Sequence, residues 1–102
     1  MHLIDTHCHI NMMTKSTFDQ PLSQAEVDAA HLIITTAAEK QVTRIINVGT
    51  SLIESQNCIA LAKQYKNVFA VIGIHPTDCT ADWKSDFVQL KKLLAQKETL
   101  KI

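Results

Sequence analysis

The chain has 102 residues, of which 46% are hydrophobic and 20% charged, and its ten basic residues balance ten acidic ones. This length allows one modest domain, and the composition is that of a folded globular protein rather than a disordered one. Zero net charge excludes the basic excess of a dedicated nucleic-acid-binding protein, although an enzyme can still concentrate charge at one site.

Cysteine usage and the N-terminal sequence indicate the compartment. The three cysteines, Cys8, Cys58 and Cys79, are an odd number and form no C-x-x-C pair. That pattern disfavours a disulfide-bonded secreted scaffold. The first residues carry no basic leader, and no run approaches the roughly 18 apolar residues of a membrane span. We therefore expect a cytoplasmic protein that does not enter the membrane.

The first half of the chain predicts a strand, a helix and a second strand. Residues 2–5 suit a β-strand and lead into polar residues 6–9. Ser23 and Glu26 form an S-x-x-E capping box at the start of the helix. A β-branched run over residues 43–50 predicts the second strand. The apolar residues that recur at helical spacing in the helix are Val27, Ala30, Ile34 and Ala37.

The second half repeats this alternation. A second S-x-x-E box begins a helix over residues 51–65. The continuous apolar run over 68–74 predicts a third strand that is buried on both faces. A third long helix is predicted over 81–96, with Trp83 and Phe87 packed against the sheet.

The last residues, 99–102, predict the start of a fourth strand. The order β-α-β-α-β-α-(β) is typical of the α/β class, in which helices pack on a parallel sheet.

The segment Asp5-Thr6-His7-Cys8-His9 is the strongest candidate site. Alternate side chains of a strand share a face, so Asp5, His7 and His9 are expected on one face and Cys8 on the other, under a helix. The carboxyl ends of parallel strands are where such sheets bind ligands. Two imidazoles there can bind one metal ion, and Asp5 can support an imidazole or reach the metal. H-x-H alone also occurs as ordinary polar residues at a strand end, but three ionisable groups on one face of a buried strand favour a metal site.

His75 is the second candidate, in the segment Gly73-Ile74-His75-Pro76 that closes the third strand. Parallel strands bring it to the same rim as His7 and His9, where it can donate to a substrate phosphate or to a metal-bound oxygen. The alternative is an ordinary loop histidine before a proline. The two glycines of the chain stand apart, so no glycine-rich phosphate loop is present.

These motifs resemble those of the TatD family of metal-dependent hydrolases and deoxyribonucleases. Residues 3–10, LIDTHCHI, resemble the opening strand of the family. Residues 45–50, IINVGT, resemble its second strand, and residues 71–76, VIGIHP, resemble the G-x-H-P segment on its third. The three matches occur in the order of the family.

The resemblance implies an amidohydrolase-like (β/α)8 barrel of the TIM type, with residues 1–102 as a partial domain that holds the first three βα units. It also implies hydrolysis of DNA or another phosphodiester with a divalent metal ion, Mg, Mn or Zn. His7 and His9 match the metal ligands of the first strand, and His75 matches a residue near the substrate phosphate. Asp5 matches the start of the motif and is expected to support a ligand. No catalytic carboxylate is assigned.

Two features depart from the family pattern. Asn11 stands where the family usually has Asp, so any salt bridge made by that carboxylate is expected to be missing. A complete barrel needs about 250 residues, so the chain is expected to be truncated. The Glu of the fourth strand, two further histidines and an Asp of the last strand are not found in it. We therefore expect the chain by itself to be inactive.

Three interpretations stay open. The chain is the N-terminal part of a nuclease, a short subunit whose barrel is completed by another chain, or a non-catalytic remnant. Open sheet edges in a partial barrel favour self-association. Other amidohydrolases and polymerase-and-histidinol-phosphatase-type phosphoesterases open with similar histidine motifs, but they usually lack the combination of H-C-H and G-x-H-P.

Overall fold

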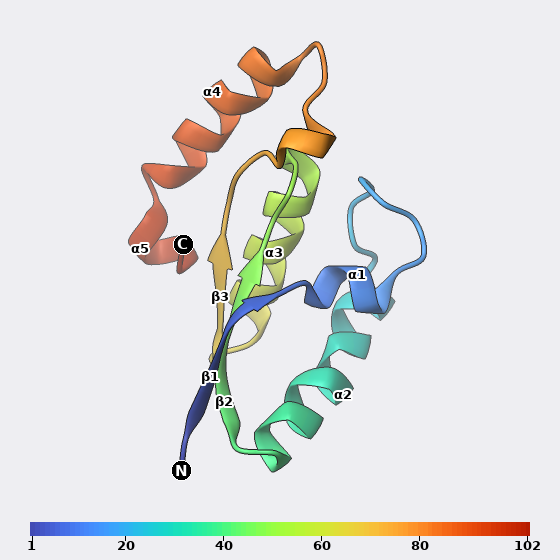
Figure 1. The fold of residues 1–102 in the computed structure, drawn as a ribbon, viewed down its shortest axis with the longest axis vertical. Helices are drawn as coiled ribbons and strands as arrows, with labels where there is room; N and C mark the ends of the chain where they lie inside the picture. Colours follow the sequence, from blue (N-terminus) through green and yellow to red (C-terminus); the bar gives the residue numbers. More distant parts are fainter.

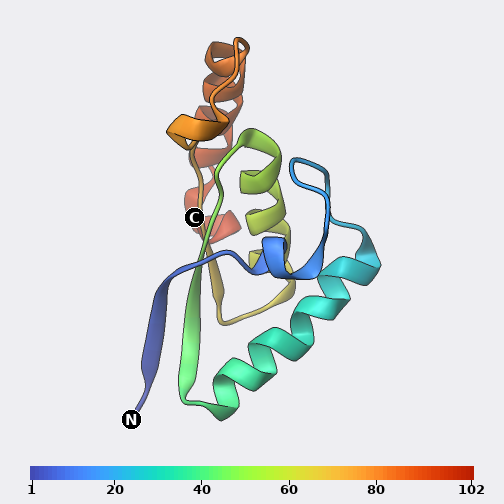
Figure 2. The ribbon, with the colours of Figure 1, turned by 45° about the vertical axis from the view of Figure 1, so that its right-hand side comes forward.

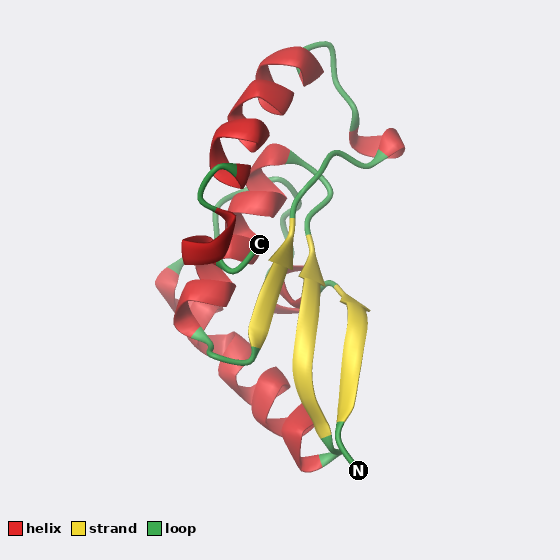
Figure 3. Cartoon of the chain, turned by 90° about the vertical axis from the view of Figure 1, so that its left-hand side faces the viewer, coloured by secondary structure: helices red, strands yellow, loops and turns green.

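Three parallel strands lie side by side in the order β1-β2-β3 (Figure 1 and Figure 3). The computed structural model describes residues 1–102. No helix is both long and apolar enough to cross a bilayer. The elements are β1 (Leu3–Cys8), α1 (Ile10–Thr14), α2 (Gln24–Glu39), β2 (Val42–Val48), α3 (Leu52–Gln64), β3 (Val68–Val71), the 3-10 turn η1 (Pro76–Asp78), α4 (Trp83–Leu94) and α5 (Lys97–Leu100).

Helices α2 and α3 cover one face of the sheet (Figure 2). Strand alternation decides which residues meet them: Ile45 pairs with Val68 and Asn47 pairs with Ala70, and all four are buried. The predicted helical stripe of α2 supplies the opposite wall of this core. The main core cluster consists of Ile10, Val27, Ala30, Ile34, Ile45, Leu61 and Val68.

The other face of the sheet carries no helix (Figure 2). Ile4 is 50% exposed and Val71 is 43% exposed, although both belong to strands. The prediction that the third strand is buried on both faces is therefore wrong for residues 1–102. Its apolar residues alternate between the face that α3 covers and a face that no helix covers, where the Lys101 side chain lies over the Phe69 ring.

Both predicted S-x-x-E boxes begin helices, but they differ in kind. At α2 the box is complete, because Ser23 Oγ accepts the Glu26 N–H at 3.2 Å and the Glu26 carboxylate accepts the Ser23 N–H at 3.1 Å. At α3 only half of it forms: Ser51 Oγ accepts the Glu54 N–H at 3.1 Å, and the Glu54 carboxylate turns into the protein interior. This second glutamate therefore has a different role from capping.

The prediction that Trp83 and Phe87 pack in the core is wrong. Trp83 is 44% exposed and Phe87 is 51% exposed, and Leu90 is the one buried residue of α4. The reason is the position of α4, which stands beyond the end of β3 with no strand beneath it (Figure 1). The two aromatic side chains instead line an open groove of about 400 Å³ with the loop that follows β3.

The predicted fourth strand is also wrong, because residues 97–100 form the short helix α5. The N–H of Leu100 donates to Gln96 at 2.9 Å, and the Leu100 side chain is buried against α3 and β3. One strand-like contact survives: the Ala70 N–H of β3 donates to the Lys101 carbonyl at 3.0 Å. A single hydrogen bond at that edge does not make a ladder, so the chain satisfies its other main-chain groups within the helix.

Candidate metal site at the carboxyl edge of the sheet

The carboxyl ends of the three strands surround a hollow of about 350 Å³. His7 lines it from β1 and His9 from the position directly after β1, with Thr50 from the segment after β2 and His75 from the segment after β3. A hydrogen bond of 2.7 Å from the His75 N–H to the Thr50 carbonyl ties the second and third segments together. The three histidines predicted from the sequence therefore lie around one hollow, as parallel pairing requires.

His7 and His9 are neighbours in this hollow. Their ring centroids are 5.0 Å apart, with the planes 76° from parallel. His9 Nδ1 lies 2.9 Å from the Val48 carbonyl oxygen, which can only accept a hydrogen bond. Nδ1 therefore carries the proton, and the neutral ring keeps a lone pair on Nε2. This is the tautomer in which an imidazole binds a metal through Nε2.

His75 is held in the opposite tautomer. Its Nδ1 accepts the main-chain N–H of Thr77 at 3.2 Å and lies 2.7 Å from the Thr77 hydroxyl. In the neutral ring the proton is consequently on Nε2, which makes that nitrogen a hydrogen-bond donor. A donor of this kind suits an anionic oxygen better than a metal ion.

Asp5 does not share a face with the imidazoles. Asp5 pairs with Ile45 and Cys8 pairs with Asn47, so three steps along β1 match two along β2. This irregularity reverses the simple alternation and brings Asp5 and Cys8 to the same face. The Asp5 carboxylate accepts the His7 N–H at 3.0 Å and makes no hydrogen bond to an imidazole. The prediction that Asp5 points with the histidines is wrong. That Asp5 supports a metal ligand stays a prediction, and the one contact available for it is the hydrogen bond from the His7 main chain.

Cys8 packs against the main core cluster, as the sequence predicts for a small residue under the helices. Burial, helped by the Asp5 charge, raises the pKa of its thiol. At α3, burial and the Glu54 charge raise the pKa of the Cys58 thiol to about 12. Without a metal ion both thiols therefore stay protonated at neutral pH, so neither is an activated nucleophile.

The two imidazoles are fewer ligands than a metal centre needs. No group of three or more His, Cys, Asp or Glu side chains lies close enough together to hold a metal ion. The two imidazoles are ligands that zinc and manganese accept, but a stable site needs further ligands. His7 and His9 thus fit a divalent ion as two of its ligands, and no third His, Cys, Asp or Glu side chain is placed to complete the set.

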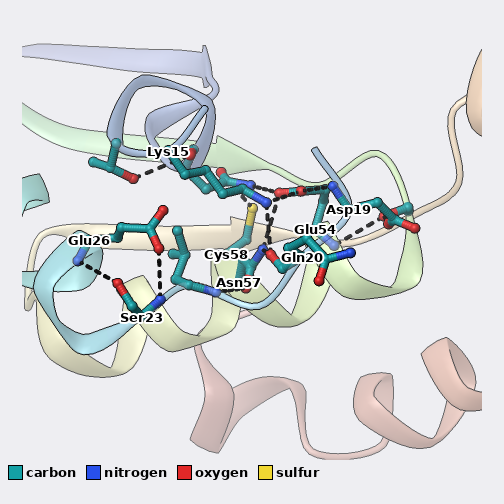
Figure 4. A network of polar contacts seen from close by, with 12 residues as sticks. Lys15, Asp19, Gln20, Ser23, Glu26, Glu54, Asn57 and Cys58 are labelled. Carbon is teal, nitrogen blue, oxygen red and sulfur yellow. Dashed lines mark hydrogen bonds and ion pairs between the residues drawn. The ribbon is translucent and has the colours of Figure 1, made fainter. Parts of the chain in front are cut away.

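A buried polar network lies behind the site and was not predicted from the sequence (Figure 4). Its centre is Glu54, which is fully buried and pairs with Lys15. The same carboxylate accepts the Asp19 N–H at 2.8 Å and the Asn57 amide at 3.2 Å. Burial alone would raise the pKa of Glu54, but the hydrogen bonds from Lys15, Asn57 and the others outweigh it and lower that pKa. The one sequence signal, the S-x-x-E box, indicated a cap and not a buried charge.

Asn11 belongs to this network. It is fully buried, and its Nδ2 donates to the Glu54 carboxylate. The sequence led us to expect a missing salt bridge at this position. The structure shows the reason why an amide fits: the neighbouring carboxylate already has Lys15 as its counter-charge, and a second carboxylate in place of Asn11 would repel it.

Parallel βα units with histidines on the carboxyl edge define an α/β protein built like the opening of a TIM-type barrel. The family model described as TatD related DNase matches residues 4–102. The chain belongs to that family, and its fold corresponds to the first βα units of the barrel. A Bacillus subtilis (strain 168) relative named "Uncharacterized metal-dependent hydrolase YabD" is 29% identical over 100 residues. That match covers 98% of this chain and 35% of the relative, so the chain spans about a third of the relative's length.

Proposed function

We propose that this chain is the metal-binding opening of a divalent-metal-dependent hydrolase that cleaves phosphodiester bonds, with DNA as the first substrate to test. The observation that carries the proposal is the pair formed by His7 and His9, in which the Val48 carbonyl leaves His9 Nε2 free. Family membership and the name of the Bacillus relative support metal-dependent hydrolysis. The phosphodiester class rests on the description of the family.

The residues of this chain have separate tasks in that reaction. His7 and His9 hold a divalent ion, Mg, Mn or Zn, which when bound lowers the pKa of a water and polarises a phosphoryl oxygen. His75 donates from Nε2–H to an anionic oxygen of the substrate and so orients the phosphate. One oxygen of the Asp5 carboxylate is bound to the main chain of His7, and no residue of this chain is assigned to remove the proton from the attacking water.

Zinc titration of the chain tests the ligand assignment. We expect His7→Ala and His9→Ala each to weaken Zn²⁺ binding by about 100-fold or more, because even the partners of metal-bound histidines are worth about 10- to 100-fold. His31→Ala is the matched control, since His31 lies on α2 against Tyr65 and away from the edge. Calorimetry at neutral pH measures all three variants. Zinc affinity unchanged in His9→Ala would refute the assignment.

The substrate class needs a second experiment. The same His7→Ala substitution, made in the complete gene product, is expected to abolish metal-dependent cleavage of a labelled DNA while the circular dichroism spectrum is retained. Cleavage at the wild-type rate would contradict the proposal. Metal-dependent activity of the wild type on other esters but not on DNA would show that DNA is not the substrate.

A partner-completed half-barrel is the second candidate. The observation in its favour is the uncovered face of the sheet, where Ile4 and Val71 are about half exposed, together with the outer edge of β1. Exposed apolar strand surface and free edges favour association. We expect sedimentation velocity to show oligomers of the isolated 102-residue chain at micromolar concentration. A monomer that unfolds cooperatively would count against this candidate.

A further inference from the structure

We propose that Asn47 is the positioning residue for His9. It holds the main chain directly after His9, so that the imidazole meets the Val48 carbonyl and keeps Nε2 free. This inference rests on the proposed metal-binding role of His9 and adds the residue that sets the geometry of that ligand.

Two neighbouring residues of β2 hold two neighbouring residues of the site. The Asn47 Oδ1 accepts the Ile10 N–H at 2.8 Å, and the Val48 carbonyl accepts the His9 Nδ1–H at 2.9 Å. His9 is the N-terminal cap position of α1, and its own side chain makes no capping bond. Asn47 therefore satisfies a free N–H of that helix start from a different element.

α1 depends on this contact for its position. It spans five residues, Ile10–Thr14, and a helix of that length is not stable by itself. Its start is buried, because Ile10 has no exposed surface. Without the acceptor, the Ile10 N–H would be buried and unpaired, and the chain would shift to recover a partner. The ring of His9 is one residue away and would leave the Val48 carbonyl.

The orientation of Asn47 is determined by its surroundings. The residue is fully buried, and its Nδ2 donates to Asn11 Oδ1 at 3.2 Å and lies 3.3 Å from Cys58 Sγ. Asn11 is in turn bound to the Glu54 carboxylate. The oxygen of Asn47 must therefore face Ile10 and the nitrogen must face Asn11. Burying an amide costs more free energy than burying the apolar residues beside it on β2. The hydrogen bonds to Ile10 and Asn11 offset that cost at Asn47.

The test compares Asn47→Leu with Asn57→Leu. Asn57 is a close match, because its Oδ1 also accepts one main-chain N–H, from Leu22 at 2.9 Å, and its Nδ2 also donates to a side chain at 3.2 Å. It is 4% exposed, and its hydrogen bonds go to Leu22, Gln20 and Glu54 rather than to the residues around His9. Each substitution therefore removes three side-chain hydrogen bonds, and only the one at Asn47 removes a bond to the residue that follows His9.

Two measurements are made on the whole chain. The first is the tautomer of His9 in the metal-free protein, from long-range ¹H–¹⁵N correlation spectra of the imidazoles. The second is the affinity for Zn²⁺. We expect the wild type and Asn57→Leu to show Nδ1–H at His9 and zinc affinities within about 3-fold of each other. We expect Asn47→Leu to lose that tautomer and to bind Zn²⁺ about 10- to 100-fold more weakly.

Asn47→Thr is the second variant, since threonine suits a strand but its hydroxyl is one bond shorter than the amide. Loss of the tautomer in either Asn47 variant, with Asn57→Leu intact, supports the proposal. It is overturned if Asn47→Leu keeps the tautomer, if Asn57→Leu loses as much, or if neither Asn47 variant folds while Asn57→Leu does. A wild type that has Nδ1–H at His9 but whose zinc affinity is unchanged by His9→Ala would instead refute the proposed function and leave the positioning role measurable.

Discussion

Replacing Glu54 with alanine is expected to destabilise the protein by about 3–5 kcal/mol, the range for breaking a buried ion pair by removal of one partner. The side chain of Glu54 has no exposed surface, and that of its partner Lys15 is 4% exposed. The substitution leaves an ammonium group inside the protein with no counter-charge. It also removes the acceptor of the Asp19 N–H and of two buried amides, Asn11 and Asn57. Urea unfolding followed by circular dichroism measures the loss.

Glu26 provides a matched control, because it occupies the same position in the other S-x-x-E box. The Glu26 side chain makes its hydrogen bond to the cap residue Ser23 at the protein surface. Glu26→Ala is therefore expected to cost much less than Glu54→Ala. Equal losses for the two variants would mean that Glu54 acts as a helix cap and not as the centre of a buried network.

The same carboxylate is expected to contribute to the pH dependence of stability. Its pKa is lower in the folded protein than the ordinary value of 4.5. The ionised form therefore stabilises the fold at pH values above 4.5, and this contribution is lost as the pH falls through the lowered pKa. Glu54→Gln should show a flatter loss of stability in acid than the wild type. Parallel curves for the two proteins would show that Glu54 does not titrate in this way.

Gly49→Ala is expected to cost about 3 kcal/mol, at the upper end of the range for overpacking a buried position. An added Cβ at Gly49 would lie 2.6 Å from Ser55 Cα and 2.8 Å from Ser55 N. These are main-chain atoms of α3, so a side-chain rotation cannot relieve the clash. β2 and α3 would have to move apart at the wall of the histidine hollow, which Gly49 lines. We expect a lower urea midpoint and weaker zinc binding together.

Gly73→Ala is the control on the same hollow. An added Cβ there meets no atom within 4 Å, and its φ angle is not positive. We expect a change in stability within about 0.5 kcal/mol, or a small gain from the reduced freedom of the unfolded chain. If Gly49→Ala were as mild as Gly73→Ala, the contact between Gly49 and α3 would be looser than the structure describes.

Local patterns were enough to predict the class of fold and the histidines of the edge. The S-x-x-E boxes begin α2 and α3 as predicted, because a cap depends on residues three positions apart. The parallel order of the strands follows from their alternation with helices, and it brings His7, His9 and His75 to one hollow. The roles of these three residues as ligands and phosphate donor stay predictions.

Patterns failed where the outcome depended on neighbours distant in sequence. Trp83 and Phe87 have helical spacing, but periodicity does not say whether a strand lies beneath the helix. Residues 99–102 were predicted to begin a strand, but the outer edge of β3 makes one main-chain hydrogen bond to them. The turn of α5 satisfies more of their main-chain groups. Asp5 was placed by strict alternation, which the irregular register of β1 against β2 reverses.

The sequence by itself determined the α/β order, the family motifs and the residue types at the edge of the sheet. Each of these can be read from a short stretch of the chain, because helix caps and strand alternation depend on residues a few positions apart. Only the tertiary structure decided that Glu54 is a buried charge paired with Lys15, and that Asn47 and Val48 hold the turn after His9. These contacts join residues more than 35 positions apart. The free energy of a buried polar group depends on whether a partner reaches it, and the partner is brought there by the packing of the helices on the sheet.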